Sequence, residues 1–281
     1  MISEIDCYVP GRSFPAVSVT GRNCALRCKH CSGVYLERMM EATEPEALLR
    51  IAERLSAAGA EGFLLTGGFD ASGKVPLSEF KDAISTIKET TSLTINAHVG
   101  LMPRPELQEL VSSGVDAFSV DIIGSDAAIR STMGLDARTE DFLAVVGSLR
   151  DLGAKTIAPH ICVGIEGGEL GGEAKAIEML APFAPEAIVI IALVPTRGTP
   201  YEHVRPPSSE NILDVIRAAR EAMPKSRLLL GCMRPRADRE WESAAVRAGV
   251  NGIAMPSKGT VRRLAQEGWN IVEKRRCCAI E

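Results

Sequence analysis

The sequence predicts an α/β protein folded as a single (β/α)8 barrel of the TIM type. Short apolar runs rich in β-branched residues alternate with longer helical patterns, eight such pairs can be counted, and no change in composition divides them. A closed barrel is preferred to an open sheet because closure removes both unprotected sheet edges. The alternative is a partial barrel or a Rossmann-like sheet.

The eight expected strands are short apolar segments, and one amphipathic helix is expected after each of them. The expected strands are residues 16–20, 62–66, 93–99, 116–123, 156–163, 187–194, 227–233 and 251–255. The expected helices are 45–59, 77–90, 104–114, 139–153, 173–183, 209–221, 238–249 and 259–268, with apolar residues at three- and four-residue spacing. Residues 1–281 therefore form one domain, with a core of about 14–268 and short terminal extensions.

Composition excludes several classes of protein. The net charge of −4 and the mixed charged residues leave no basic stripe for nucleic acid. No apolar run reaches the roughly 20 residues of a membrane span, and the first residues lack the features of a secretory signal, so we expect a cytoplasmic protein that contacts no membrane. Because cytosolic thiols stay reduced, metal ligation is the first hypothesis for a cysteine cluster.

A three-cysteine loop follows the first expected strand. Cys24, Cys28 and Cys31 have the spacing CxxxCxxC. Three thiolates would leave one iron of a four-iron cluster free to bind another ligand. The alternatives are a structural zinc site with His30 as its fourth ligand, or three buried cysteines that only fill space. The loop follows a strand end, where barrel active sites form.

This loop resembles the defining motif of the radical S-adenosylmethionine (SAM) superfamily. The resemblance implies a [4Fe–4S] cluster on Cys24, Cys28 and Cys31, with the amine and carboxylate of SAM on the open iron. A reducing electron donor would supply one electron, and SAM cleavage would release a 5′-deoxyadenosyl radical. His30 matches a family position near the adenine, although a solvated loop histidine is an equal alternative.

Three further segments resemble SAM-contacting turns of this family. Gly67 and Gly68 match a turn whose backbone contacts the SAM amine, with Phe69 in place of the usual Glu. Residues 160–173, with His160 and Gly164, resemble a segment of the biotin synthase group that borders the SAM carboxylate and ribose. Residues 195–202, with Thr196, resemble that group's turn near the adenine. Ordinary βα turns are the alternative for each.

The other cysteines suggest a second, auxiliary iron–sulfur cluster. Cys277 and Cys278 are adjacent in the polar tail, beside two arginines that would lower their pKa. With Cys7 they are predicted to be three cluster ligands, and Cys232 is a candidate for a fourth. Cys162 aligns with a cluster ligand of biotin synthase, but it is equally well explained as a small core residue.

Polar side chains near the strand ends are candidates for substrate binding. The candidates are Asn96, His98, Asp121, Arg234 and Arg236. The two guanidinium groups could clamp a carboxylate or phosphate, or pair with the acidic residues of the next helix.

The length, the turns and the paired cysteines most resemble a subunit of the archaeal-type two-component lipoyl synthase. That resemblance implies a second radical SAM subunit and a lipoyl-domain protein carrying an octanoyl chain as partners, and sulfur insertion as the reaction. The alternatives are a biotin-synthase-like or hydrogenase-maturase-like enzyme acting on a small molecule, and a non-catalytic iron–sulfur scaffold.

Overall fold

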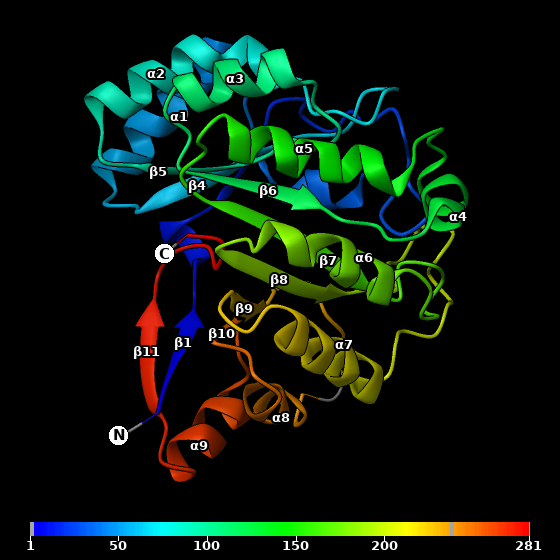
Figure 1. Ribbon diagram of the computed structural model, residues 1–281. Coiled ribbons are helices and arrows are strands. Elements are labelled where there is room, and N and C mark those ends of the chain that lie inside the picture. The colour runs from blue at the N-terminus through cyan, green and yellow to red at the C-terminus, as the bar shows by residue number, and fades with distance from the viewer. Residues whose placement is uncertain (1–2, 237–238, 281) are drawn as a thin grey trace.

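The computed structural model describes residues 3–236 and 239–280, and these residues form one curled sheet covered by helices (Figure 1). All the strand pairings in the sheet are parallel, which is the arrangement that βα alternation produces. The strands are β1 (Glu4–Tyr8), β2 (Ala16–Ser18), β3 (Met40–Glu41), β4 (Gly62–Thr66), β5 (Thr94–His98), β6 (Ala117–Asp121), β7 (Ile157–Val163), β8 (Ala187–Ala192), β9 (Arg227–Leu230), β10 (Gly252–Ala254) and β11 (Asn270–Lys274).

The sheet is an open, 11-stranded partial barrel, so the expected closure into an eight-stranded barrel is wrong. Its order is β11-β1-β10-β9-β8-β7-β6-β5-β4-β2-β3, and β3 and β11 are its two edges. The eight strands expected from the sequence are all present, and β1, β3 and β11 are additional. Because β1 pairs with both β10 and β11, the last of the eight expected strands meets β1 and not β2.

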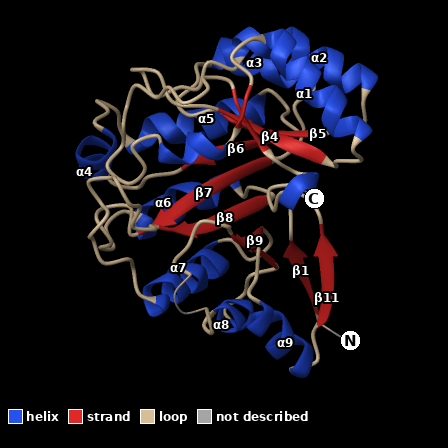
Figure 2. Cartoon of the chain, turned by 180° about the vertical axis from the view of Figure 1, so that it is seen from behind, coloured by secondary structure: helices blue, strands red, loops and turns tan. Residues whose placement is uncertain are grey.

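The helices lie on the convex face of the sheet, as Figure 2 shows from behind. The α-helices are α1 (Pro45–Ala57), α2 (Lys81–Thr90), α3 (Arg104–Ser112), α4 (Asp126–Ala128), α5 (Thr139–Asp151), α6 (Glu173–Leu180), α7 (Ser209–Ala222), α8 (Glu242–Arg247) and α9 (Lys258–Gln266). Short 3₁₀ turns span Gly11–Ser13, Val34–Arg38, Ser78–Phe80 and Ala181–Phe183, and a π turn spans Ile129–Met133. Among the described helices, none is long and apolar enough to cross a membrane.

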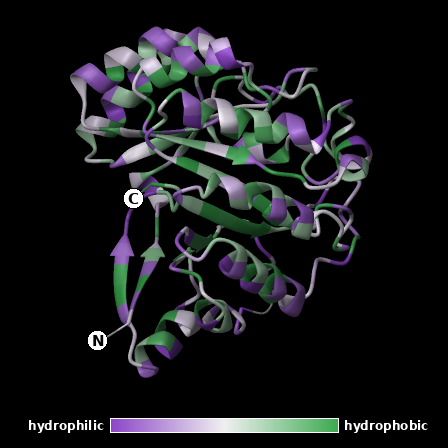
Figure 3. Ribbon diagram, viewed as in Figure 1, coloured by the Kyte–Doolittle hydropathy of each residue, from purple (hydrophilic) through white to green (hydrophobic). Residues whose placement is uncertain are grey.

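The main core lies between the convex face of the sheet and the helices. Side chains alternate between the two faces of a strand, so Ile95 and Ala97 of β5 enter this core while Asn96 and His98 face the concave side. Figure 3 shows hydrophobic residues concentrated on the central strands and hydrophilic residues on the outer helices. The concave face therefore receives the polar side chains of the strands, and it is where a site can be built.

Candidate active site

The three-cysteine loop leaves the sheet at the end of β2 and forms a tight turn. The backbone N–H groups of Cys31 and Ser32 both donate to the carbonyl of Cys28, at 3.1 and 2.8 Å. Arg27, Ser32 and the glycine that follows adopt left-handed φ angles, which lets the chain reverse twice within a few residues. Cys28 is buried, and Cys24 and Cys31 are partly exposed.

The nearby thiols of Cys28 and Cys31 influence each other's pKa. The interaction with Cys28 lowers the pKa of Cys31 to about 4 against the effect of burial, and the interaction with His30 acts in the same direction as Cys28. The same contact, with burial, raises the pKa of Cys28. One thiol of the loop is thus stabilised as the thiolate, which is the form that binds metals.

Gly67 and Gly68 follow β4 and support the cysteine loop. A Cβ atom on Gly68 would lie 2.0 Å from the carbonyl oxygen of Asn23 and 2.6 Å from the Cβ of Cys24. The Gly68 N–H donates to the hydroxyl of Thr20 at 2.7 Å. From the sequence, we expected glycine at these positions because their backbone would contact SAM. The structure shows another reason why position 68 must be glycine: the cysteine loop occupies the space that a side chain would fill.

The segments that follow β6 and β8 hold the middle of the cysteine loop. The N–H of Lys29 donates to the carbonyl of Thr132 at 2.8 Å, and the carbonyl of Lys29 accepts from the N–H of Tyr201 at 3.2 Å. The hydroxyl groups of Thr132 and Tyr201 are themselves 3.0 Å apart. Thr132 belongs to the π turn after β6, and such turns often occur at functional sites. Sequence reasoning singled out neither residue, although Tyr201 lies within residues 195–202, the segment that resembles a SAM-contacting turn.

Thr196, after β8, also contacts the cysteine-loop region. Its hydroxyl lies 2.7 Å from that of Tyr35, which follows the third cysteine. The loop is thus connected to the ends of β4, β6 and β8, and sequence reasoning identified Thr196 but not Tyr35.

His30 is the other notable side chain of the loop. Its Nδ1 atom is buried and has no hydrogen-bond partner among the described residues. Burial lowers its pKa, but the hydrogen bond and charge of Cys31 outweigh that effect and leave the pKa raised. A buried polar atom without a protein partner is unusual in a native protein, and a bound water or ligand would satisfy it.

The residues present fit an iron–sulfur cluster with an open iron. Three thiols on one tight loop supply soft ligands, one of them is already favoured as a thiolate, and the buried Nδ1 of His30 offers a polar contact to a bound molecule. Cys24, Cys28 and Cys31 could therefore hold a [4Fe–4S] cluster.

His98, Asp121 and His160 form a polar group on the concave face, where β5 and β6 end beside the middle of β7. The Nε2 atom of His98 lies 3.0 Å from Oδ2 of Asp121, and both side chains are partly exposed. Burial raises the pKa of Asp121, but the charge and hydrogen bond of His98 outweigh it and bring the pKa down to about 2. Burial likewise lowers the pKa of His98, and Asp121 outweighs it, so that pKa is raised.

His160 remains neutral beside this pair. Its pKa is lowered, first by burial and also by the charge of His98, although Asp121 opposes both effects. Its Nδ1–H donates to the carbonyl of Ala158 at 2.8 Å, which fixes the tautomer because a carbonyl only accepts.

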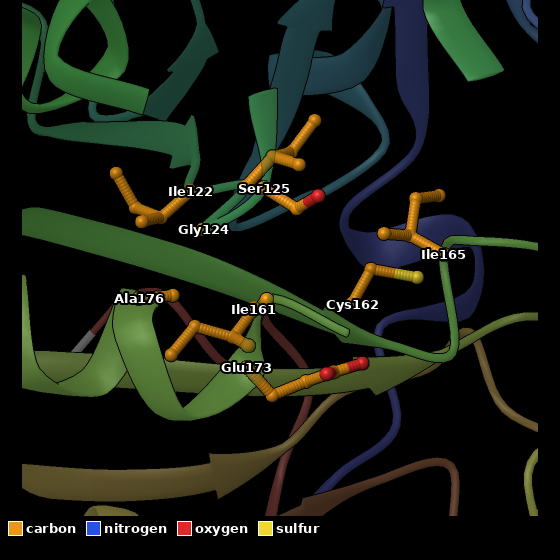
Figure 4. Close-up of a pocket in the computed structure, with 10 residues that line it drawn as sticks. Ile122, Gly124, Ser125, Ile161, Cys162, Ile165, Glu173 and Ala176 are labelled. Carbon is orange, nitrogen blue, oxygen red and sulfur yellow. The ribbon is translucent and has the colours of Figure 1, made fainter. Parts of the chain in front are cut away.

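The glycine-rich segment after β7 is held by Glu173, which sequence reasoning did not single out. Its carboxylate accepts hydrogen bonds from the N–H groups of Gly164 and Gly171, at 2.7 and 2.8 Å. Gly164 has a φ of 72°, which favours glycine. In Figure 4 the sulfur of Cys162 and the carboxylate of Glu173 point to the same side of a small pocket. Burial raises the pKa of Cys162, so this thiol stays protonated.

The terminal cysteines do not assemble with Cys7 as the sequence predicted. Tyr8, the neighbour of Cys7 on β1, packs against Cys278 on the concave side. Since adjacent residues of a strand face opposite ways, Cys7 points to the helical side with Ile5. Burial and the charges of Asp6, Glu273 and Glu242 raise the pKa of Cys7 to about 11.

Arg234 is not available as a substrate clamp. Its side chain is buried and donates to Glu242 of α8 at 2.6 Å and to the carbonyl of Ala254 at 2.8 Å. The pairing with the acidic helix, which was the competing interpretation, is the one observed. Arg236 is exposed, and its Nη2 lies 3.9 Å from the sulfur of Met255.

Comparisons with known proteins agree with this geometry. Residues 18–169 match the Radical SAM superfamily, and residues 189–276 match the Biotin and Thiamin Synthesis associated domain. The biotin synthase of Ruegeria pomeroyi is 28% identical over 249 residues, which cover 84% of this chain and 76% of that protein. The biotin synthase of Methylobacterium nodulans is 29% identical over 255 residues, covering 84% and 72%.

Solved structures share the fold at lower identity. The FeFe-hydrogenase maturase HydG from Carboxydothermus hydrogenoformans has a TM-score of 0.69 and 16% identity, covering 95% of this chain and 67% of that chain. Methylornithine synthase (PylB) has a TM-score of 0.65 and 17% identity, covering 96% and 83%. In another HydG structure, with a TM-score of 0.67 and 16% identity, the match covers 90% of this chain and only 57% of that chain.

The superfamily match decides the cofactors. Radical SAM proteins use a [4Fe–4S] cluster and SAM, and these are accordingly the cofactors of this chain. Because the matching segment spans more than half of the 281 residues, the protein belongs to the radical SAM superfamily, in its biotin-synthase-related branch.

Proposed function

We propose that this protein is a radical SAM enzyme that inserts sulfur at unactivated carbon, with Cys24, Cys28 and Cys31 as the ligands of the SAM cluster. One observation carries the proposal. The three-cysteine loop is connected to the ends of β4, β6 and β8, and thiols from other parts of the chain lie on the concave side of the same sheet. The concave side of the sheet could therefore hold both groups that sulfur insertion needs, the source of the radical and the source of the sulfur.

The bound cluster and SAM supply a 5′-deoxyadenosyl radical that can abstract hydrogen, and the chain contributes binding and orientation. His30, with its unpartnered Nδ1, and the backbone of Gly67 and Gly68 are proposed SAM contacts. His160, Gly164 and Thr196 extend the SAM site along the ends of β7 and β8.

The polar layer beside this site is proposed to position the substrate. Asp121 keeps a negative charge and His98 a raised pKa, so the pair can offer both an acceptor and a donor. Asn96, on the same face of β5, is only 1% exposed and its amide already contacts Ser119 and Cys277, so it is not available to a substrate. Arg236 remains a candidate for an anionic group of the substrate, whereas Arg234 does not.

For the substrate we propose an octanoyl chain attached to a lipoyl domain, as in a lipoyl synthase that works with a second radical SAM subunit and an external electron donor. Support comes from the relationship to biotin synthases and from the second group of thiols at the tail. A long alkyl chain could enter the concave side of a sheet that is not closed.

An anaerobic assay with octanoylated lipoyl-domain peptide tests this proposal. With a strong reductant and a candidate partner subunit, we expect 5′-deoxyadenosine and a thiolated octanoyl product. SAM cleavage with a biotin-synthase substrate in place of the peptide would support the small-molecule alternative. An iron-loaded protein that cleaves no SAM under any of these conditions would be a scaffold, and the enzymatic proposal would fail.

A further inference from the structure

Two hydrogen-bond acceptors stand side by side on the concave face of the sheet. Asp121 of β6 and His160 of β7 are register partners on neighbouring strands, so their side chains are adjacent on the same face (Figure 1). Both side chains are partly exposed, and 32% of the Asp121 side chain is accessible. A molecule bound in the interior of the curled sheet could therefore contact both of them.

His160 presents a lone pair at Nε2. Its Nδ1–H donates to the carbonyl of Ala158 at 2.8 Å, and a neutral imidazole carries only one N–H group. The lowered pKa of His160, caused first by burial, keeps the ring neutral. The part of the chain that the structure describes places no hydrogen-bond donor at Nε2, so this atom is open to a ligand.

One carboxylate oxygen of Asp121 is in the same situation. Oδ2 interacts with Nε2 of His98 at 3.0 Å, and none of the described residues places a donor at Oδ1. An imidazole lone pair and a carboxylate oxygen cannot satisfy each other, so a ligand beside them must bring a donor. Because the ion pair with His98 balances the charge of Asp121, a neutral donor suits this position better than a cation.

Apolar side chains border the two acceptors on the side of β8. Val189 is the register partner of His160, and Ile191 is the register partner of Cys162. Burial raises the pKa of Cys162, so its thiol stays protonated and adds no charge. A ligand that matches these surroundings combines a neutral N–H group with a hydrocarbon chain.

We propose that Nε2 of His160 accepts a hydrogen bond from the amide N–H of the octanoyl-lysine substrate, with Oδ1 of Asp121 as the neighbouring acceptor. Val189 and Ile191 then contact the alkyl chain. This contact rests on the proposed function, whose substrate it would recognise. It moves His160 from the SAM contacts to the substrate site, because His160 lies in the middle of β7 whereas Gly164 follows the end of that strand.

Replacing a single group of the ligand tests this hydrogen bond. A lipoyl-domain peptide that carries octanoyl-lysine is compared with the same peptide carrying the ester isostere, in which oxygen takes the place of the N–H. Binding is measured by anaerobic calorimetry on cluster-loaded protein with SAM and without reductant, so that no turnover occurs. We expect wild type to bind the amide about tenfold more tightly, because the ester removes the donor and brings a further acceptor.

Two variants locate the acceptor. His160→Phe removes Nε2 and keeps a ring, so the preference for the amide over the ester should fall to about twofold or less, while the affinity for SAM stays unchanged. His203→Phe replaces an exposed histidine outside the site and is the matched control. This control should retain the preference of the wild type. Circular dichroism and iron content verify that both variants are folded and loaded.

The outcomes distinguish this contact from the proposed function. Equal affinity of the wild type for the two peptides would overturn the contact and leave the octanoyl substrate in place, and this comparison needs no variant. A preference that survives in His160→Phe, together with weaker SAM binding, would assign His160 to SAM and also overturn the contact. If neither peptide binds to the wild type, the octanoyl substrate itself fails, and the contact fails with it.

Discussion

The Nε2 atom of His98 and the Oδ2 atom of Asp121 lie 3.0 Å apart, and they join β5 and β6 across the concave face of the sheet. The ion pair exists only while His98 is protonated and Asp121 is ionised, and a neutral His98 leaves a hydrogen bond alone. Asp121 raises the pKa of His98, and His98 lowers the pKa of Asp121.

The stability from this pair should therefore depend on pH in a defined window. Asp121 has a pKa of about 2 against an ordinary value of 3.8, so its contribution is complete above pH 3.8 and is lost as the pH falls toward 2. The pKa of His98 is raised from 6.5, so its contribution is complete below pH 6.5 and is lost as the pH rises through the raised pKa. The free energy of unfolding of the wild type should exceed that of Asp121→Asn by about 1–2 kcal/mol between pH 4 and 6.5.

Urea unfolding of both proteins at several pH values measures this difference. The difference in the free energy of unfolding should become smaller below pH 4 and above pH 6.5. A difference that does not change with pH would contradict the ion pair.

Removal of the three loop thiols tests the SAM cluster directly. Replacing Cys24, Cys28 and Cys31 with Ala should abolish reductive SAM cleavage and remove about four irons per chain, because these thiolates hold the cluster. The readouts are 5′-deoxyadenosine by chromatography and iron by colorimetry. Full SAM cleavage by this variant would refute the central assignment.

Gly68→Ala should disturb the cysteine loop and not only SAM binding. The new Cβ would lie 2.0 Å from the Asn23 carbonyl oxygen, so the loop must move. We expect lower iron content after reconstitution. Gly67→Ala is the matched control, because its nearest contacts are side-chain atoms 3.1 Å away, and it should keep its iron. Equal iron in both variants would show that the close approach is not needed.

Tyr201→Phe removes the hydroxyl that lies 3.0 Å from Thr132 while keeping the ring. The loss of one partly buried hydrogen bond should cost about 1 kcal/mol and should loosen the support of Lys29 in the cysteine loop. Faster iron loss to a chelator, at unchanged iron content before the challenge, is the expected result. If the rate is unchanged, the backbone hydrogen bonds alone hold the loop.

The tail should contribute to stability, in contrast to the expectation that it lies outside the core. Ile280 is 6% exposed and packs with Phe14 and Ala117. Ile280→Ala should lower the free energy of unfolding by about 2–4 kcal/mol, measured with urea. Leu170→Ala, at a position 46% exposed, should change it by no more than about 0.5 kcal/mol. A similar effect from both substitutions would mean that the tail is not packed.

Local patterns in the sequence were sufficient for most of the secondary structure. The eight expected strands and the eight expected helices all appear, since apolar periodicity reports directly which face of an element is buried. The first and last strands, β1 and β11, were missed because both lie outside the βα alternation. Their pairing depends on contacts between residues more than 260 positions apart.

The sequence by itself determined the βα architecture and the cysteine loop, because a motif of eight residues encodes its own turn and its own ligand chemistry. Only the tertiary structure decided that the sheet stays open, that Arg234 is occupied by Glu242, and that Cys277 meets Asn96 while Cys7 points to the other face. These relationships depend on which strands pair and on which side of the sheet each residue faces. A shift of one residue along a strand reverses that side, and spacing along the chain does not record which strand lies beside it.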